Sequence, residues 1–367
     1  MFKNILIIFF VSLLTIGTLI ASETTRPVLL PDIRTEAMGG SGIMNATGAL
    51  AFNYNPAILA REEYNFTLAD VQISMSDDFA DFYAYLDDNK DKFGMLDKEK
   101  YPDLTPQQTD EIINDLRLEA AKLDNIWARG RLVPSMGLNI KNIGIGFYNI
   151  ASVALKSDVG IVVPKVFLKV YNDFVFTAGY GKQIWPNFSL GANLKIIRRN
   201  EAPLYKIQVE EVNSLEDTWE AGKEEFSSAK SGFGIDLGGI YHFDKNLQFG
   251  AVLQDFIGRI DGISTPLNMK VGMHYLISEQ LTLAGSIQDF FNVQGDHFFK
   301  KMHIGGEYSI PIFRFRAGIS QGYLTGGLGI DFKVLKINYT YFQREIASAP
   351  GQDTEGLHML GLQFVAF

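Results

Sequence analysis

Apolar and polar residues alternate strictly along the second half of the chain, in residues 267–275, 302–310, 313–320 and 335–341. A period of two places successive side chains on opposite faces of an extended strand. Turn-forming residues separate these segments at intervals typical of strands of about ten residues. The pattern therefore predicts a long series of β-strands and an all-β fold.

Short and long connections alternate between the predicted strands. The short connections fall at 243–246, 278–280, 310–311 and 332–334, and the longer ones at 255–266, 291–299, 320–326 and 343–356. Such alternation is typical of transmembrane barrels, which have tight turns at one end and longer loops at the other.

The number of strands must be even if the chain begins and ends at the same side of a membrane. Fifteen candidate strands can be counted, and the surplus falls between residues 143 and 182. There Pro164 removes a hydrogen-bond donor from the ladder, so we interpret Val163–Tyr171 as a short helix or a strand extension. The sequence thus predicts a transmembrane antiparallel β-barrel of about fourteen strands.

Charged residues decide which face of these strands meets lipid, because a soluble sandwich also alternates. Arg314 and Arg316 would each cost about 2–4 kcal/mol on the lipid-facing side near the bilayer midplane. The apolar set is therefore expected to face lipid and the polar set a lumen. The predicted lumenal charges are Glu307, Arg314, Arg316, Asp331 and Lys336.

The first 22 residues have the pattern of a cleavable secretory signal peptide. Lys3 precedes an apolar run from Ile5 to Ile20, and small residues follow at Ala21 and Ser22. The chain contains no cysteine, so neither disulfides nor a lipidated cysteine is expected. Gly 35, Phe 28 and Tyr 15 fit a lipid-facing barrel with aromatic girdles. We expect an outer-membrane location, with membrane lipid as a partner.

Two stretches of the predicted barrel, residues 75–130 and 200–230, have helical periodicity and are expected to be extracellular insertions. Thr105 and Gln108 flank Pro106 in a capping box, which predicts a helix start. The simplest function of the apolar stripes is to pack these helices onto the barrel rim. The alternative is an outer groove that captures apolar ligands. The candidate groove residues are Phe79, Phe82, Leu86, Ile112, Leu116 and Trp219.

Residues 23–63 lie between the leader and the first strand, and are rich in glycine and small residues. Gly39, Gly40 and Gly42 allow close packing, and Asn55-Pro56-Ala57 predicts a fixed turn. Such a segment cannot build a core of its own, so we expect it to pack inside another structure. Residues 64–367 are predicted to form that structure.

The glycines together with Ala51–Leu59 resemble the plug motif of the FadL-like outer-membrane proteins. That superfamily includes channels for long-chain fatty acids and aromatic hydrocarbons, PorV/PorQ-like proteins, and TraF-like and UPF0164 barrels of unassigned role. The resemblance implies a fourteen-stranded barrel with an N-terminal plug, or hatch, that contains Asn55, Pro56 and Ala57. The sequence departs from the family at Thr47-Gly48, where aspartate is common, and at Ile58, where glycine is common. Phe367 resembles the terminal signal read by the barrel-assembly machinery, a partner during biogenesis.

No motif for catalysis, a metal or a cofactor stands out in the sequence. The histidines lack metal-ligand spacing, and no phosphate-binding loop or nucleophile elbow is present. His242, His274 and His303 are expected simply to face the lumen. A net charge of −9 with no basic patch argues against nucleic acid as a partner. We therefore predict a protein that is not an enzyme and needs no cofactor.

Two functions fit these observations. The first is passive uptake of hydrophobic small molecules, of the long-chain fatty acid or aromatic type, through a barrel gated by the N-terminal plug. The second is a PorV-like barrel that acts as a secretion accessory, a carrier of surface proteins or a structural protein. A general porin is disfavoured, because an apolar plug would obstruct a water-filled pore.

Overall fold

The computed structural model describes residues 25–96, 101, 103–123, 126–158, 165–208 and 226–366. The predicted signal peptide, Trp219 and Phe367 lie outside these residues. Among the described residues, no helix combines the length and the apolar character needed to cross a membrane.

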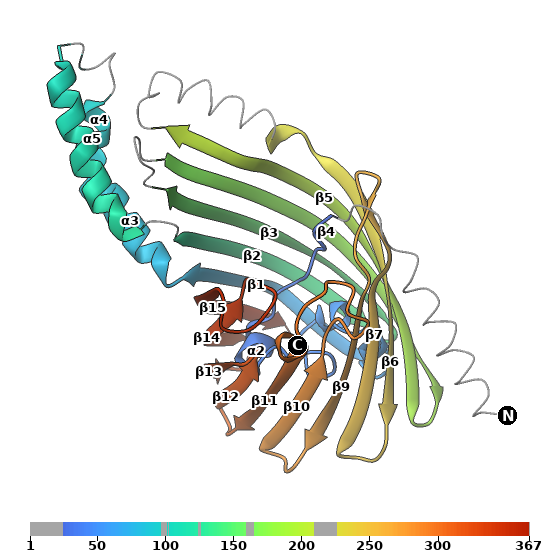
Figure 1. Ribbon diagram of the computed structural model, residues 1–367. Coiled ribbons are helices and arrows are strands. Elements are labelled where there is room, and N and C mark those ends of the chain that lie inside the picture. The colour runs from blue at the N-terminus through green and yellow to red at the C-terminus, as the bar shows by residue number, and fades with distance from the viewer. Residues whose placement is uncertain are drawn as a thin grey trace.

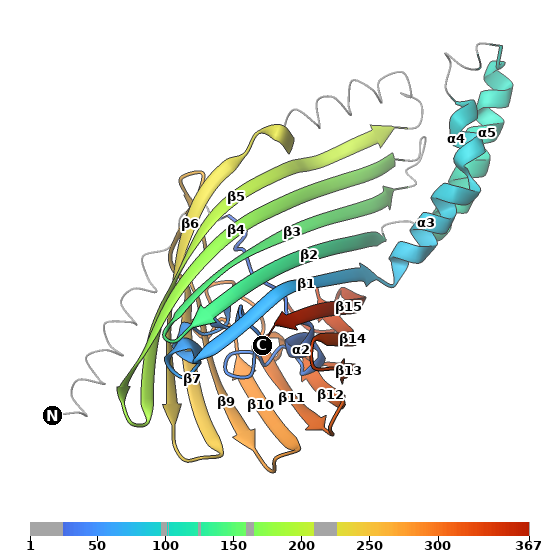
Figure 2. The ribbon, with the colours of Figure 1, turned by 180° about the vertical axis from the view of Figure 1, so that it is seen from behind.

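Fourteen long antiparallel strands close into a barrel (Figures 1 and 2), which confirms the number predicted from strand parity. Neighbours in sequence are neighbours in the sheet, β1 pairs with β15, and β6 pairs with β7, so the ring is complete. The strands are β1 (Tyr64–Ser76), β2 (Trp127–Ile140), β3 (Ile143–Asp158), β4 (Lys165–Trp185), β5 (Phe188–Gln208), β6 (Lys230–His242), β7 (Leu247–Ile260), the short β8 (Ile263–Ser264), β9 (Asn268–Leu276), β10 (Leu281–Ile287), β11 (Met302–Ser309), β12 (Phe313–Ser320), β13 (Tyr323–Asp331), β14 (Leu335–Glu345) and β15 (Thr354–Ala366).

The wall of the barrel is much taller on one side than on the other (Figure 1). Strands β3 to β5 have 16 to 21 residues, whereas β10 to β13 have 7 to 9. Phe174 and Phe176 are exposed on the outer face of β4, and Asn172 follows them toward the end of the barrel that carries the helical insertion, here termed the helical end. On β5 exposed Leu194 and Ile196 give way to Arg198. Polar residues therefore interrupt the apolar outer face of the tall wall at this level, and on β4 the outward Val170 and Leu168 follow them.

Three boundaries differ from the sequence-based expectations or resolve them. Residues 165–171 continue β4, so the strand-extension interpretation of this stretch is correct. Residues 200–208 belong to β5 rather than to a helical insertion, and 209–225 lie outside the described residues. The predicted long connection at 320–326 is wrong: only Gln321 and Gly322 separate β12 from β13.

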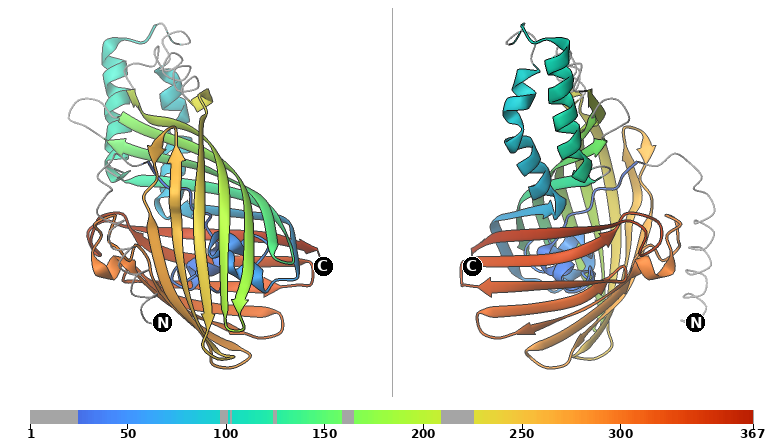
Figure 3. Two further views of the ribbon diagram at one scale, coloured as in Figure 1. Left: turned by 90° about the vertical axis from the view of Figure 1, so that its right-hand side faces the viewer. Right: turned by 60° about the vertical axis from the view of Figure 1, so that its left-hand side comes forward.

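The insertion between β1 and β2 forms a helical arm of α3 (Asp78–Asp88), α4 (Lys90–Met95), α5 (Pro106–Ala120) and the short η3 (Ala121–Leu123). Thr105 caps α5 in the predicted capping box. The arm projects beyond the rim, as Figure 3 shows. Its base packs on the outer face of the sheet, where Phe82, Tyr85 and Ala128 are buried together. Burial raises the pKa of Tyr85 to about 12, and its hydroxyl donates to the carbonyl of Leu116.

Residues 25–63, here termed the N-terminal segment, lie inside the barrel as a chain with three short helices (blue in Figure 3). These are α2 (Ile33–Ala37), η1 (Ala51–Asn53) and η2 (Pro56–Ala60). A further short helix, η5 (Phe298–Lys301), precedes β11.

Candidate functional site in the barrel lumen

The N-terminal segment contacts strands on every side of the lumen. The backbone N–H of Thr25 donates to the carbonyl of Ser264 in β8, so the segment starts beside β7 at the helical end of the barrel. It then descends to α2, where the carbonyl of Ile33 accepts a hydrogen bond from Thr340 of β14. Its last residues reach the turn end, where Arg61 donates to the carbonyl of Pro186.

Glycines on the inner face of the wall allow this close fit. A β-carbon at Gly191 would lie 2.5 Å from the nitrogen of Ala57, and one at Gly305 would lie 2.5 Å from the carbonyl carbon of Met38. Real β-carbons do not tolerate such distances, so the backbone of the segment can lie there only because these positions are glycine. Gly318 likewise meets the backbone of the segment. Further wall glycines lie against its side chains: Gly137, Gly144, Gly179, Gly238, Gly250 and Gly327.

The predicted plug glycines have two different environments. Gly39 and Gly40 have positive φ angles of 69° and 82°, which glycine adopts without strain. They lie against the wall: the N–H of Gly39 donates to Thr325 Oγ1 (3.1 Å), and its carbonyl contacts His303 Nδ1 (2.7 Å). Gly42 instead faces the segment itself, because a β-carbon there would lie 2.6 Å from Thr35 Oγ1.

Asn55, Pro56 and Ala57 form the start of η2 rather than a free turn. Asn55 is fully buried, and its Oδ1 accepts from the N–H of Ala57 (3.0 Å) while its Nδ2 donates to the carbonyl of Gly239 (3.3 Å). Pro56 occupies the first helical position, where no N–H is needed. One side chain thus caps the helix and ties it to β6.

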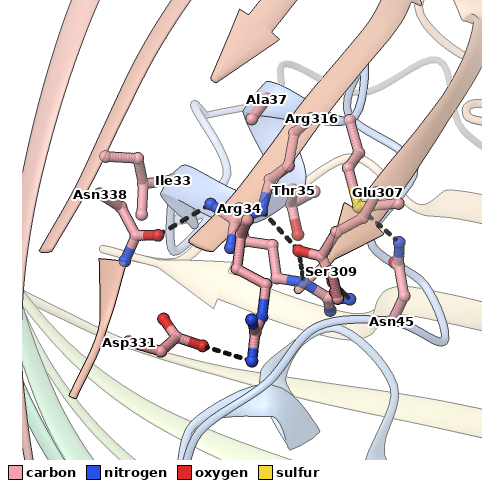
Figure 4. Close-up of polar contacts among 12 residues, drawn as sticks. Ile33, Arg34, Thr35, Ala37, Asn45, Glu307, Ser309, Arg316, Asp331 and Asn338 are labelled. Carbon is pink, nitrogen blue, oxygen red and sulfur yellow. Dashed lines mark hydrogen bonds and ion pairs between the residues drawn. The ribbon is translucent and has the colours of Figure 1, made fainter. Parts of the chain in front are cut away.

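The five predicted lumenal charges come together at the turn end of the barrel, around a cavity of about 230 Å³. Arg34 of α2 donates two hydrogen bonds to Glu307, of 2.9 and 2.8 Å, and Arg316 donates a third of 2.6 Å (Figure 4). Arg314 pairs with Asp331 at 3.2 Å. The remaining charged residues that line the cavity are Asp32, Asp70 and Lys336.

Arg34, Asp32 and Asp70 line this cavity although they were not among the predicted lumenal charges, and of the three Arg34 makes the strongest contacts. It lies 273 positions from Glu307, so no local spacing connects the two residues. The available signal was its charge in a segment expected to be enclosed, because a buried guanidinium requires a carboxylate partner. Bidentate pairs of this kind combine strength with fixed geometry, so Arg34 and Glu307 hold α2 against β11.

A second polar network joins η1 to the tall wall. Asn193 Nδ2 donates to Asn53 Oδ1 (3.2 Å) and to Asp236 Oδ2 (3.1 Å). Lys195 lies 3.0 Å from Asp236 and 2.5 Å from Asp255, and all three side chains are almost completely buried. Each charge here has an opposite charge in contact, which buried ionic groups require.

A third ionic group holds the start of the N-terminal segment. Arg199 donates to both carboxylate oxygens of Asp173, at 2.7 and 3.1 Å. Arg26 pairs with the same carboxylate at 2.7 Å and stacks on the ring of Tyr171 at 3.9 Å.

Between these polar groups the lumen has an apolar layer. Val28, Leu50, Phe52 and Leu59 of the N-terminal segment fill it, and Phe52 is 0% exposed. The wall contributes Val133, Tyr148, Ile150, Val175, Ile197 and Ile260. In this arrangement the segment's own side chains occupy the apolar interior of the barrel.

The candidate outer-groove residues mostly contact one another. Phe82 is 1% exposed and Leu116 0%, and Phe79, Leu86 and Ile112 are half-buried around them. These side chains therefore pack the helical arm together and onto the sheet. Capture of a ligand by this surface stays a prediction, and Trp219 lies outside the described residues.

Among the described residues, no group of three or more histidine, aspartate and glutamate side chains is arranged to hold a metal ion. The lumenal side chains form hydrogen bonds and ion pairs with one another. Chemically, the arrangement can bind an apolar molecule in the layer only after the N-terminal segment moves.

Comparison by sequence finds no family model and no curated protein that matches the chain. Comparison by structure finds outer-membrane channels. The "CymD monoaromatic hydrocarbon channel" matches with a TM-score of 0.52 and 10% identity, over 93% of this chain and 98% of that one. The toluene transporter TodX of Pseudomonas putida matches with a TM-score of 0.50 and 11% identity, over 94% and 99%. The chain therefore has the fold of FadL/TodX/CymD-type barrels, as the plug motif predicted.

Proposed function

We propose that this barrel is an outer-membrane channel for passive uptake of hydrophobic small molecules, closed at rest by the N-terminal segment. The fold supports the class, since CymD and TodX are described as channels or transporters of aromatic hydrocarbons. A cleavable leader and an assembly signal at Phe367 would bring the chain to the outer membrane and its lipid. A ligand of the long-chain fatty acid or aromatic type fits this proposal.

The observation that carries the proposal is the apolar layer on the tall-wall side of the lumen. A pore for hydrophilic solutes needs polar walls throughout, whereas here Val28, Leu50 and Phe52 bury their side chains against apolar wall residues. When these side chains withdraw, the layer can accept an apolar molecule in their place. Burial at about 25 cal/mol per Å² supplies affinity without a charged anchor. Gating by Gly39, Gly40, Gly42, Asn55, Pro56 and Ala57 is part of this proposal.

A reversible lock tests whether the segment must move. A β-carbon at Gly137 would lie 3.1 Å from that of Ala49, a few tenths of an ångström short of the usual spacing of about 3.5–4.5 Å in disulfides. The native chain has no cysteine. We expect the double variant Ala49→Cys/Gly137→Cys to lose uptake of a labelled fatty acid or of toluene into proteoliposomes when oxidised, and to regain it with a reductant.

Each single-cysteine variant is the control and should be insensitive to reductant. The same preparation is measured before and after reduction, so faulty barrel assembly cannot imitate the result. Uptake that stays at the rate of empty vesicles in the reduced and native proteins would contradict the channel.

A carrier of surface proteins is the second candidate, and the helical arm favours it. The arm projects beyond the rim, and Tyr83 and Leu118 on it are exposed. Crosslinking in native membranes would distinguish the two functions. A stoichiometric protein partner, joined to an arm residue and combined with absent uptake, would favour the carrier.

A further inference from the structure

We propose that the connection between β10 and β11 inserts aromatic side chains into the outer leaflet of the membrane and anchors the short wall there. This connection, residues 288–301, ends in η5. Its partner is the acyl chains of a lipid surface rather than another protein. The inference rests on the membrane location of the proposed channel, but not on what the channel transports.

Three phenylalanine side chains of this connection are exposed. The exposed fraction is 45% for Phe290, 55% for Phe298 and 59% for Phe299. Phe298 and Phe299 meet edge to edge or edge to face, with ring centroids 6.0 Å apart. Exposed aromatic rings gathered in one short segment mark a surface that binds something apolar. Phe290, Phe298 and Phe299 are here termed the aromatic wedge.

The charged side chains of the same connection are turned away from solvent. Lys301 Nζ donates to the carbonyl of Asp289 (3.1 Å) and lies 3.6 Å from its carboxylate. Lys300 pairs with Asp296 at 2.9 Å and donates to the carbonyl of Ala347 (2.7 Å). These four charged side chains are at most 18% exposed. A loop in water normally exposes its charges and covers its aromatic rings, so the inverted arrangement fits an apolar solvent.

The backbone of the connection is also suited to surroundings with little water. The N–H groups of Val293 and Gln294 donate to the carboxylate of Asp289, at 2.8 and 3.1 Å. Those of Asn292 and Gly295 donate to carbonyls within the connection. Paired N–H groups matter in lipid, because no water is present there to replace a missing partner.

The wedge continues the outward apolar surface of the short wall. Ile287 of β10 pairs with Val271 of β9, and at the next level the N–H of Phe290 donates to the carbonyl of Met269 (2.9 Å). Asp289, with a φ angle of 46°, is the extra residue of a bulge. Phe290 therefore takes the outward position beside Met269, which faces the same side as Val271.

The helix η5 brings the other two rings to the same rim. The residue after it, Met302, accepts a hydrogen bond from the N–H of Gln321 (3.1 Å). Gln321 belongs to the two-residue hairpin that ends β12 and β13, so η5 lies beside the point where the short wall stops. Figure 3 shows η5 (orange) at this rim. The N–H of His297 donates to the carbonyl of Ser348 (2.9 Å), which ties η5 to the β14–β15 connection.

The height of the short wall explains why an anchor is useful there. Strands of 7 to 9 residues, tilted by about 40°, rise about 18–23 Å. The apolar band of transmembrane barrels is about 25 Å tall. Without further apolar surface, the bilayer would have to thin on this side. Aromatic rings at the rim add to the lipid-facing height of the short wall.

Single-cysteine variants labelled with a fluorophore test the depth of the connection in vesicles of the purified protein. Phe298→Cys and Phe290→Cys probe the wedge, and Gln294→Cys is the matched control in the same connection. Ile304→Cys reports on the outer face of β11, and Tyr83→Cys on the arm in water; both native residues are exposed. We expect iodide to quench the two wedge labels at least threefold less than the labels at Gln294 and Tyr83. A nitroxide on the upper acyl chain of the lipid should quench them at least half as strongly as the label at Ile304.

Two results would overturn the wedge and leave the channel intact. Wedge labels as open to iodide as the Gln294 label, with the Ile304 label protected, would place the connection in water. Protection from iodide without quenching by the lipid would mean that a second copy of the barrel covers the connection. An Ile304 label open to iodide would instead refute the membrane location, and the proposed channel with it. Phe290 and Phe298 lie in different parts of the connection, so the test survives if one of the two variants does not fold.

Discussion

At the scale of single residues, the N-terminal segment fits against the wall mainly because several inward-facing wall positions are glycine and have no side chain. The segment's backbone approaches inward-facing glycines at Gly191, Gly305 and Gly318 to distances that a β-carbon would prevent. The sequence directed attention to the glycines of the segment itself, but the glycines of the strands make most of the close contacts. Alternation along the strands explains why, since every second strand residue must face the segment.

Gly238→Ala should destabilise the folded protein, because its β-carbon would lie 2.8 Å from Pro56 Cδ and would also meet Asn55. Overpacking of this kind costs about 1–3 kcal/mol. The free energy of unfolding by urea in lipid vesicles measures the effect. Gly239→Ala is the matched control: Gly239 faces outward, its β-carbon would lie 3.4 Å from the nearest atom, and the change should cost less than about 0.5 kcal/mol. Equal costs would show that the segment does not press on β6.

At the scale of elements, the helical arm shows how one apolar stripe can serve packing alone. Leu116 of α5 is 0% exposed, and Phe82 of α3 packs against Ala128 of β2. Helical stripes face whatever apolar surface the chain offers, and here that surface is the outer face of the tall wall.

The connection at 320–326 is an element whose length was overestimated from the sequence. Gln321 and Gly322, with φ angles of 56° and 91°, close a two-residue hairpin, although the surrounding residues had suggested a loop.

Leu116→Ala should loosen the arm and leave the barrel intact, since it removes a fully buried side chain at a cost of about 2–5 kcal/mol. Limited proteolysis of vesicle-inserted protein should then cut within the arm, while the barrel keeps its heat-modifiable migration in gels. Leu118→Ala, two positions on and 73% exposed, should leave the proteolysis rate unchanged. Faster cleavage in the Leu118 variant than in the Leu116 variant would contradict this packing.

At the scale of the whole molecule, the unequal wall determines how the barrel would sit in a bilayer. Strands that cross a membrane need about 9–11 residues when tilted, and the short wall, with 7 to 9 residues in β10 to β13, lies at or just below the lower limit. The tall wall exceeds this length in β4 and β5, each with 21 residues. The change from exposed Phe176 to Asn172 on β4 marks the expected upper limit of the lipid contact.

Single cysteines labelled with a fluorophore should locate this limit, because the native chain has none. A lipid-attached quencher should quench labels at Phe176 and Leu194, which lie in the apolar belt. Labels at Asn172 and Asn200, on the same outer faces but nearer the helical end, should be quenched at least threefold less. Equal quenching at all four positions would mean that the belt extends to the top of the tall wall.

The sequence by itself determined the properties that repeat with a local period. Alternation identified the strands and the inward direction of Arg316, strand parity fixed their number, and Thr105 with Gln108 located the start of α5. Each of these depends on residues a few positions apart, so the chain carries the information locally.

Tertiary structure decided what depends on closure of the ring. Only closure brings Arg34 to Glu307 and sets the wall glycines against the N-terminal segment. It also turned the arm's apolar stripe toward the outer face of β2 rather than toward a ligand. The physical reason is that contacts between distant residues depend on strand register and barrel closure, and no local period in the sequence encodes them.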